Sequence, residues 1–325
     1  MDRFVKKVGV AVIILNCLAA AAYAQSGSYP NRPVRFIVPV APSGGSDPLA
    51  RLMAAKLNLK FKQSFVVENI SGAAGQLAVQ TVAKALPDGY TLFLASSSSY
   101  NGSVLGGKSD FDPRKAVVPV AQLTAMPSIM SVNVSLPING LKDLQDYFRK
   151  NPDGVAFASS GIGSSPHLLG ELVNLRAGIK MLHVPYKGIG PGILDVIGGR
   201  IQIVFASPSA TGQYARAGKI RPIAVTSRKR LSSLPEVASL EEQGLKGFNW
   251  VSWFGVMTTG GTPRQNILII NAAVNEALSL PDVLKAFSAD GSEPAPGTPE
   301  DFQEAVDNVL DQAQAVVKEL NIPLE

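Results

Sequence analysis

The amino-acid sequence predicts an α/β protein made of two similar units. The chain has 325 residues, which suits about two domains of roughly 150 residues each. Apolar runs rich in β-branched residues alternate with stretches of helical period, which predicts parallel sheets with helices between the strands. The alternation occurs in two series, one on each side of about residue 127. The strands are apolar throughout, as in sheets that are covered on both faces.

The first series has expected strands at Val34–Val40, Ser64–Glu68 and Tyr90–Ala95, and expected helices at Leu49–Leu59 and Gly75–Ala85. The second series has expected strands at Gly154–Ser159, Met181–Pro185, Ile201–Phe205 and Ile220–Thr226, and expected helices at Ser165–Arg176 and Pro191–Ile197.

Two further helices are expected near the C-terminus. Each begins with threonine followed by proline, at Thr262-Pro263 and at Thr298-Pro299, an arrangement that is favoured at helix starts. No strands accompany these helices, so we expect them to pack on the first unit. The first unit then comprises residues 25–126 and 255–325, and the second unit comprises residues 127–254.

Residues 1–24 have the pattern of a secretory signal peptide. Basic residues precede a short apolar segment, and Ala22-Tyr23-Ala24 has the small–x–small form of a cleavage site. We expect cleavage after Ala24 and export to the periplasm. A membrane anchor is the alternative, but Asn16 interrupts the apolar run, which is short for a membrane span.

Composition argues against several classes of function. The chain has one cysteine, which lies inside the expected signal, and two histidines. This excludes a disulfide framework and disfavours a metal site built on cysteine or histidine. The formal charge is only +5 and no basic stripe is present, so nucleic-acid binding is not indicated. The glycine-rich segments lack the spacing of nucleotide-binding loops. We expect no metal, no cofactor and no nucleic acid.

The segments that follow the expected strands are the most informative feature. They are rich in glycine and serine, and they lie where open α/β sheets bind ligands. Helix N-termini carry unpaired N–H groups and the positive end of the helix dipole, so such segments bind anions without a cationic side chain. The candidate ligand-binding residues in these segments are Pro42, Ser43, Gly44, Gly45, Ser46, Asp47, Ser97, Ser98, Ser160, Gly161, Gly163, Ser164, Ser165 and His167.

Plain helix capping is the alternative interpretation of each segment. Asp47-Pro48 and Ser165-Pro166 would both be good helix starts without any ligand. The occurrence of three such segments favours a ligand site over capping alone.

Short motifs occur in a fixed order from about Tyr29 to Leu320. They include Tyr29-Pro30-x-Arg32-Pro33, Val38-Pro39-x-Ala41-Pro42-x-Gly44-Gly45-x-Asp47, Pro87-Asp88-Gly89-Tyr90-Thr91, Ala158-Ser159-Ser160-Gly161-x-Gly163-Ser164-x-x-His167-Leu168, His183-Val184-Pro185-Tyr186-Lys187-Gly188 and Ala224-Val225-Thr226-Ser227. With these motifs the chain resembles the Bug or TctC solute-binding receptors of tripartite tricarboxylate transporters.

The resemblance implies a two-lobed periplasmic-binding-protein fold, type II-like, with a mainly parallel sheet flanked by helices in each lobe and a hinge between the lobes. It implies a monomeric receptor, not an enzyme, that captures a small carboxylate such as a di- or tricarboxylate or an aromatic acid. The implied partners are the large and small membrane subunits of a transporter. In the family, loops that match Pro42–Asp47 and Ser160–His167 contribute to ligand capture.

One segment departs from the family pattern. After the strand that ends at Phe205, many relatives have an aspartate, whereas this chain has Ala206 followed by Ser207. An aspartate facing the cleft could pair with a ligand ammonium group, so we interpret its loss as disfavouring amino-acid ligands. Ala206 and Ser207 complete the candidate site.

Two other functions stay open from the sequence. A ligand sensor that presents its state to a membrane-bound kinase would have the same features. An α/β hydrolase or transferase would need a nucleophile–base pair with His167 or His183 as the base. The segments lack the Gly-x-Ser-x-Gly pattern of a serine-hydrolase elbow. We interpret His183 as a core residue of a strand and Arg228–Arg230 as a solvated loop.

Overall fold

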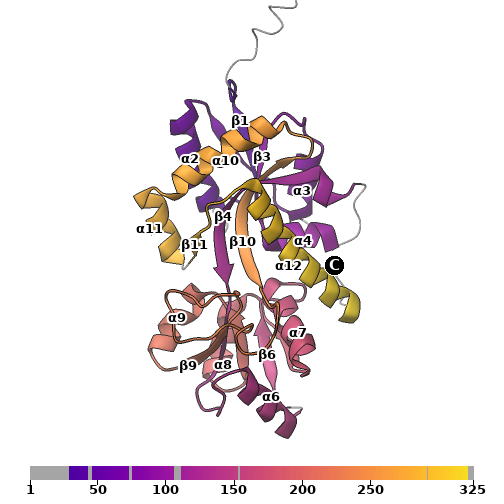
Figure 1. Ribbon diagram of the computed structural model, residues 1–325, viewed down its shortest axis with the longest axis vertical. Coiled ribbons are helices and arrows are strands. Elements are labelled where there is room, and N and C mark those ends of the chain that lie inside the picture. Colours follow the sequence, from indigo (N-terminus) through magenta and orange to yellow (C-terminus); the bar gives the residue numbers. More distant parts are fainter. Residues whose placement is uncertain are drawn as a thin grey trace, which may run out of the picture.

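The computed structural model describes residues 29–42, 46–72, 75–105, 111–152, 154–290 and 292–320. Two sheets, each flanked by helices, follow one another along the longest axis of the molecule (Figure 1). The prediction of two α/β units is therefore confirmed. The expected signal peptide, residues 1–24, lies outside the described residues.

The first sheet has six strands in the order β11-β4-β10-β3-β1-β2. They are β1 (Val34–Val38), β2 (Phe65–Asn69), β3 (Thr91–Ser96), β4 (Val117–Pro127), β10 (Val251–Thr259) and β11 (Glu293–Pro294). β1 is parallel to β2 and β3, as expected for strand–helix–strand units. β10 is antiparallel to both β3 and β4.

The second sheet has five strands in the order β7-β6-β8-β5-β9. They are β5 (Ile129–Asn133), β6 (Ala156–Ser159), β7 (Leu182–Pro185), β8 (Ile203–Ala206) and β9 (Ile220–Val225). β6 is parallel to β7 and β8, whereas β5 is antiparallel to β8 and β9. Both sheets are thus mixed. The expected parallel pairs are present. The antiparallel pairs of β5 and β10 arise because these strands enter their sheets from the opposite unit, and β11 adds one more antiparallel pair with β4.

Helices cover both sheets. They are α2 (Asp47–Phe61), α3 (Gln76–Ala83), α4 (Ser97–Leu105), α5 (Pro113–Ala116), α6 (Leu141–Lys150), α7 (Ser165–Ala177), α8 (Ile189–Ile197), α9 (Pro208–Arg216), α10 (Arg264–Leu278), α11 (Pro281–Asp290) and α12 (Pro299–Leu320). Within the described ranges no single helix is long and apolar enough to cross a membrane, although α10 and part of α11, bent by 74° at their junction, pass that test as a pair.

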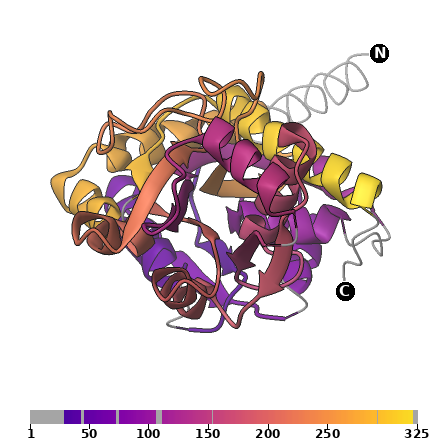
Figure 2. The same cartoon turned by 90° about the horizontal axis from the view of Figure 1, so that it is seen from below.

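The last helix, α12, contacts both units. It packs on β4, β10 and α4 of the first unit, as expected, and also on α7 of the second unit; Figures 1 and 2 show it, in yellow, running toward α7. Phe302 anchors α12 edge-on against Trp253, with 5.0 Å between ring centroids. Gly255 leaves the space for this ring, because a Cβ atom at Gly255 would lie 2.1 Å from the Phe302 ring.

The chain crosses between the two sheets at Ser128 and again at Trp250, and Thr226 joins the two crossings. The Thr226 hydroxyl accepts from Ser128 N (2.8 Å) and donates to the Trp250 carbonyl oxygen (2.7 Å). The backbone of Thr226 adds two more bonds, from its N–H to Ser128 O and from Trp250 N–H to its carbonyl oxygen. The side chain is fully buried, so every polar group of Thr226 is used to hold the crossings together.

We expect Thr226→Val to be strongly destabilising. Valine keeps the shape but removes the hydroxyl, which leaves the Ser128 N–H and the Trp250 carbonyl without this partner. The cost should be about 2–4 kcal/mol, or a fall in melting temperature of about 5–15 °C. Thr226→Ser, which retains the hydroxyl, should lose much less. Thermal unfolding followed by circular dichroism compares the two variants, and equal melting temperatures would contradict the assigned role of the hydroxyl.

Candidate ligand-binding site

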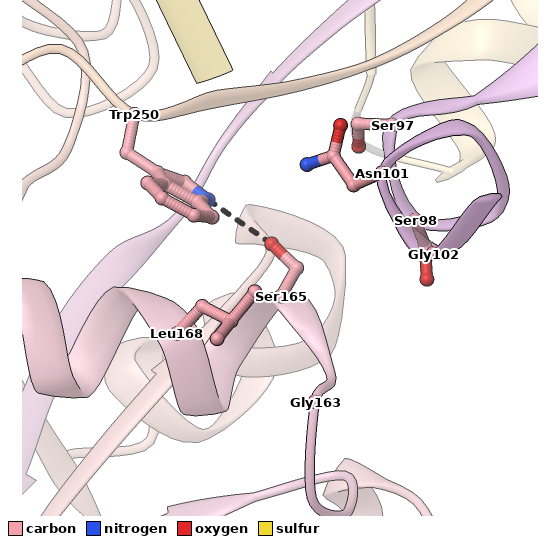
Figure 3. Close-up of a pocket in the computed structure, with 8 residues that line it drawn as sticks. All are labelled: Ser97, Ser98, Asn101, Gly102, Gly163, Ser165, Leu168 and Trp250. Atoms are coloured by element: carbon pink, nitrogen blue, oxygen red, sulfur yellow. Dashed lines mark hydrogen bonds between the residues drawn. The ribbon is translucent and has the colours of Figure 1, made fainter. Parts of the chain in front are cut away.

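Residues from both units line one small cavity (Figure 3). The lining comes from α4, from α7 and the loop before it, and from the segment that precedes β10. The residues are Ser97, Ser98, Asn101, Gly102, Gly163, Ser165, Leu168 and Trp250. The cavity volume is about 30 Å³, which is room for about two water molecules. The structure thus brings together candidate residues from two segments that are far apart in the sequence.

The start of α7 is not capped by a side chain. Ser164 is the N-cap residue, but its hydroxyl donates to the carbonyl oxygen of Gly161 (2.6 Å) and accepts nothing from the first turn. Pro166 has no N–H group, and the first-turn amides of Ser165 and His167 have no capping side chain. The positive end of this helix is therefore available to an anion.

The serine run after β3 is a helix start instead of the loop that we expected. Ser97 begins α4, and the serines on either side of its first turn exchange hydrogen bonds. Ser99 N donates to Ser96 Oγ (3.1 Å), and Ser96 N donates to Ser99 Oγ (3.1 Å). This reciprocal capping makes Ser96 and Ser99 structural. Of the two candidates, Ser98 is exposed and Ser97 is buried in the cavity wall.

Asn101 is a lining residue that the sequence analysis missed. It lies one turn beyond Ser97 and Ser98 on α4, and only 7% of its surface is exposed. Its Oδ1 atom is buried and has no hydrogen-bond partner among the described residues, although such an acceptor normally has one. Figure 3 shows the side chain extending into the space between α4 and Trp250. The helical spacing from the two serines could have identified Asn101.

Trp250 links the cavity to strand β10. Its indole N–H donates to Ser165 Oγ (3.0 Å), and Ser165 Oγ is also 3.2 Å from Ser252 Oγ. The Ser165 hydroxyl is therefore already engaged within the protein. The bond fixes the first turn of α7 to the segment where the chain crosses between the units.

The segment after β1 is described in part. Pro42 is exposed, and the candidates Ser43, Gly44 and Gly45 lie outside the described residues. Ser46 is the N-cap of α2, without a side-chain cap.

The next candidate, Asp47, is buried. Its carboxylate accepts from Asn69 Nδ2 (2.8 Å) and from Arg51 Nε (2.9 Å). The bond from Asn69 attaches the start of α2 to the end of β2. The ion pair with Arg51 balances the charge of the carboxylate.

The two histidines stack on each other behind the segment that contains Ser160, Gly161, Gly163 and Ser164. Their ring centroids are 3.8 Å apart at an angle of 21°. His167 is only 6% exposed, and its Nδ1 accepts from Gly163 N (3.0 Å). Burial lowers the pKa of His167. Burial, and secondarily the neighbouring His167, lowers the pKa of His183 to about 4. Both rings are neutral at pH 7.

His183 lies on β7, which is an edge strand, and it is not in the core as we expected. Its ring stacks on Phe157 as well as on His167. Its Nε2 is 2.6 Å from Ser159 Oγ, the kind of contact that a hydrolase would need. Ser159, however, is fully buried, and a base with a pKa of about 4 is poorly matched to general-base catalysis near pH 7. The contact is better explained as structural.

The segment after β8 carries no acidic residue near its start. Ala206 is the last residue of β8 and is buried. Ser207 is the N-cap of α9, and its hydroxyl accepts from Ala210 N (3.3 Å). Unlike α7, α9 therefore has a side-chain cap.

A second cavity, of about 870 Å³, lies between α9 and α11. It borders Pro208 and Ser209 but none of the candidate residues, and its rim carries Glu236 and Glu293 together with Arg216. Two carboxylates against one guanidinium make it a poorer place for an anion than the start of α7. Within the described residues, no group of three or more histidine, cysteine, aspartate or glutamate side chains could hold a metal ion.

Comparisons with known proteins agree with this geometry. A family model described as "Tripartite tricarboxylate transporter family receptor" matches residues 49–322. Protein BugT of Bordetella pertussis is 33% identical over 100% of this chain and 99% of its own length. A UPF0065 protein of Pseudomonas sp. strain P51 is 32% identical over 91% of this chain and 88% of its own length.

Solved structures with the same architecture include proteins with and without ligand. A TctC solute binding protein from Polaromonas, with no ligand, has a TM-score of 0.83 at 25% identity, over 90% of this chain and 100% of that chain. An R. palustris protein solved with adipate has a TM-score of 0.69 at 33% identity, over 91% of this chain and 99% of that chain. MatC from Rhodopseudomonas palustris with bound malate has a TM-score of 0.67 at 29% identity, over 89% of this chain and 100% of that chain.

The similarity extends over nearly the whole chain and includes both units. The expectation of a two-lobed periplasmic-binding-protein fold is thereby confirmed. The chain belongs to the tripartite tricarboxylate transporter receptor family, a family of periplasmic solute-binding proteins and not of enzymes.

Proposed function

We propose that the protein is an extracytoplasmic receptor that captures a small di- or tricarboxylate, or an aromatic acid, between its two lobes. One observation carries this proposal: the uncapped start of α7 on one lobe and the unpaired Asn101 on the other border the same cavity. The first favours a carboxylate, and the second favours a hydrogen-bond donor such as a ligand hydroxyl or a bound water. Adipate and malate in the two relatives support this ligand class.

Ligand capture requires the lobes to move. We propose that residues 25–126 and 255–325 form one lobe, that residues 127–254 form the other, and that the hinge lies near the Thr226 crossings. The TM-score is 0.83 with the ligand-free Polaromonas protein and below 0.7 with the adipate-bound and malate-bound proteins. These observations support an open arrangement that closes around the ligand.

The candidate residues divide into two groups in this proposal. Backbone groups of Ser160, Gly161, Gly163, Ser164 and Ser165 would hold a carboxylate at α7. The segment from Pro42 to Asp47, together with Ser97, Ser98 and Asn101, would meet the ligand from the first lobe. Residues 1–24 direct the chain to the periplasm and are then removed. The mature protein acts there as a monomer.

We propose the large and small subunits of a membrane transporter as the partners that recognise the closed form. A sensor that reports to a membrane-bound kinase is the second candidate, because it would use the same closure.

The ligand class can be tested by thermal shift on the mature protein. Malate, adipate or a related acid at about 100 times its Kd should stabilise the protein by about 2.7 kcal/mol, or about 5–10 °C. Because Ala206 offers no partner to an ammonium group, aspartate should stabilise less than malate. Failure of every mono-, di- and tricarboxylate and aromatic acid to shift the melting temperature would refute the proposal, and a larger shift with aspartate would refute the role of Ala206.

The contribution of Asn101 can be separated from stability by Asn101→Leu. Leucine has a similar volume and removes the unpaired acceptor, so the free protein should be no less stable. Affinity for the acid identified by thermal shift should fall by about 3–30-fold, because a bond to the ligand or to a bridging water is lost.

The matched control for Asn101→Leu neutralises Arg228, Lys229 and Arg230 together with glutamine. These residues are exposed, Arg228 pairs with Glu241 and Arg230 pairs with Glu242. Isothermal titration should show near-normal affinity in this triple variant. A hundredfold loss there, with normal binding by Asn101→Leu, would mean that the site lies elsewhere.

A further inference from the structure

The segment Ser160–Ser164, which we call the α7 loop, is held from behind by the stacked histidines. Gly161 and Gly163 both have positive φ values, +125° and +74°, which glycine adopts readily and other residues rarely do. Two such glycines make the loop flexible unless its polar groups are bound. Gly161 N donates to Ser159 Oγ (3.1 Å), and Gly163 N donates to His167 Nδ1 (3.0 Å).

The hydrogen bond from Gly163 fixes the protonation state of His167. A backbone N–H can only donate, so Nδ1 must be an unprotonated acceptor, and in the neutral ring the hydrogen is then on Nε2. The Nε2 atom lies 3.9 Å from a Glu171 carboxylate oxygen. The imidazole of His167 is thus oriented as an acceptor toward the loop, and its buried position prevents water from replacing it.

Further contacts hold the His167 ring itself. His183 stacks on it, and His183 Nε2 is bound to Ser159 Oγ, the same oxygen that accepts from Gly161 N. The amides of Gly163 and Gly161 are therefore both connected to the histidine pair, the first directly and the second through Ser159.

We propose that His167 is a positioning residue, whose Nδ1 atom holds the α7 loop in the conformation that binds the ligand, and that it does not itself contact the ligand. The proposal rests on the proposed function of the loop. When the acceptor is lost, Gly163 N–H is unpaired and the loop samples other conformations. Ligand binding must then reorder the loop, which lowers affinity.

Protonation has the same effect as removal of the acceptor. A proton on His167 Nδ1 would point at the hydrogen of Gly163 N–H, so the hydrogen bond would be lost. It would also add a positive charge next to His183. Each histidine faces the other, and Glu171 lies near His167. A charged Glu171 carboxylate would favour the protonated form of His167. Burial lowers the pKa of both histidines below 6.5, that of His183 to about 4. The anchor is therefore intact above pH 6.5 and is lost as the pH falls through the lowered pKa of His167.

The test compares His167→Phe with His167→Asn. Phenylalanine keeps an aromatic ring against His183 but has no acceptor, whereas the asparagine Oδ1 can occupy the place of Nδ1. Hydrogen exchange of the Gly163 amide, measured by NMR without ligand, should be about tenfold faster in His167→Phe and near the wild-type rate in His167→Asn. Leu172→Met, a change of similar volume on the buried face of α7, is the control and should not change the rate.

Affinity for malate and adipate is measured on the same proteins. His167→Phe should bind about tenfold more weakly than wild type, and His167→Asn should recover most of that loss. Between pH 7 and 4.5, wild type should lose affinity more steeply than His167→Asn, because only wild type has an imidazole at this position.

The outcomes separate this proposal from the proposed function. Equal Gly163 exchange in wild type and His167→Phe would overturn the positioning role, whether or not a carboxylate binds. Faster exchange with unchanged malate or adipate affinity would show that the loop is not used for binding. If wild type binds neither acid nor any other carboxylate, the proposed function fails, while the exchange result still decides the role of His167.

Discussion

The four hydrogen bonds of Thr226 are the constraint on which the two-lobed arrangement depends. They join the strand that leaves the first sheet to the segment that returns to it, at a position where the side chain is shielded from water. Leaving these polar groups unpaired in such a place would cost free energy. In the proposed closure the lobes would therefore pivot around this junction, which the Trp250–Ser165 hydrogen bond links to the start of α7.

In the proposed function, the candidate site would recognise a charged ligand with protein groups that carry no charge. Four helices begin with serine at their candidate segments. Serine hydroxyls cap α4 and α9, whereas α2 and α7 have no side-chain cap. At α7 the difference lies in the Ser164 hydroxyl, which turns back to the Gly161 carbonyl. The first-turn amides of α7 therefore have no capping side chain, and dispersed amide donors suit carboxylates of differing length better than a single fixed cation would.

The sequence was a good guide to local structure and a poorer guide to contacts. The parallel strands around β1 and β6 follow from apolar runs between helices, and the structure has them within a few residues of the expected ranges. Strands β4, β5 and β10 were missed because their place depends on pairing with strands that are distant in the sequence. The capping role of Ser96 and Ser99 was missed because hydroxyl orientation, which composition does not encode, decides whether a serine caps a helix or faces a ligand. Asn101 was missed although its helical spacing from Ser97 and Ser98 could have identified it.

The central place of β10 in the first sheet governs the order in which the protein can be assembled during synthesis. β10 separates β3 from β4, so those two strands have no common partner until residue 259 has been made, and Gly255 must be present before Phe302 can dock. The strands of the second sheet, by contrast, all lie between residues 129 and 225. The first lobe thus stays incomplete until nearly the whole chain is made, which lengthens the time in which the nascent chain is unfolded.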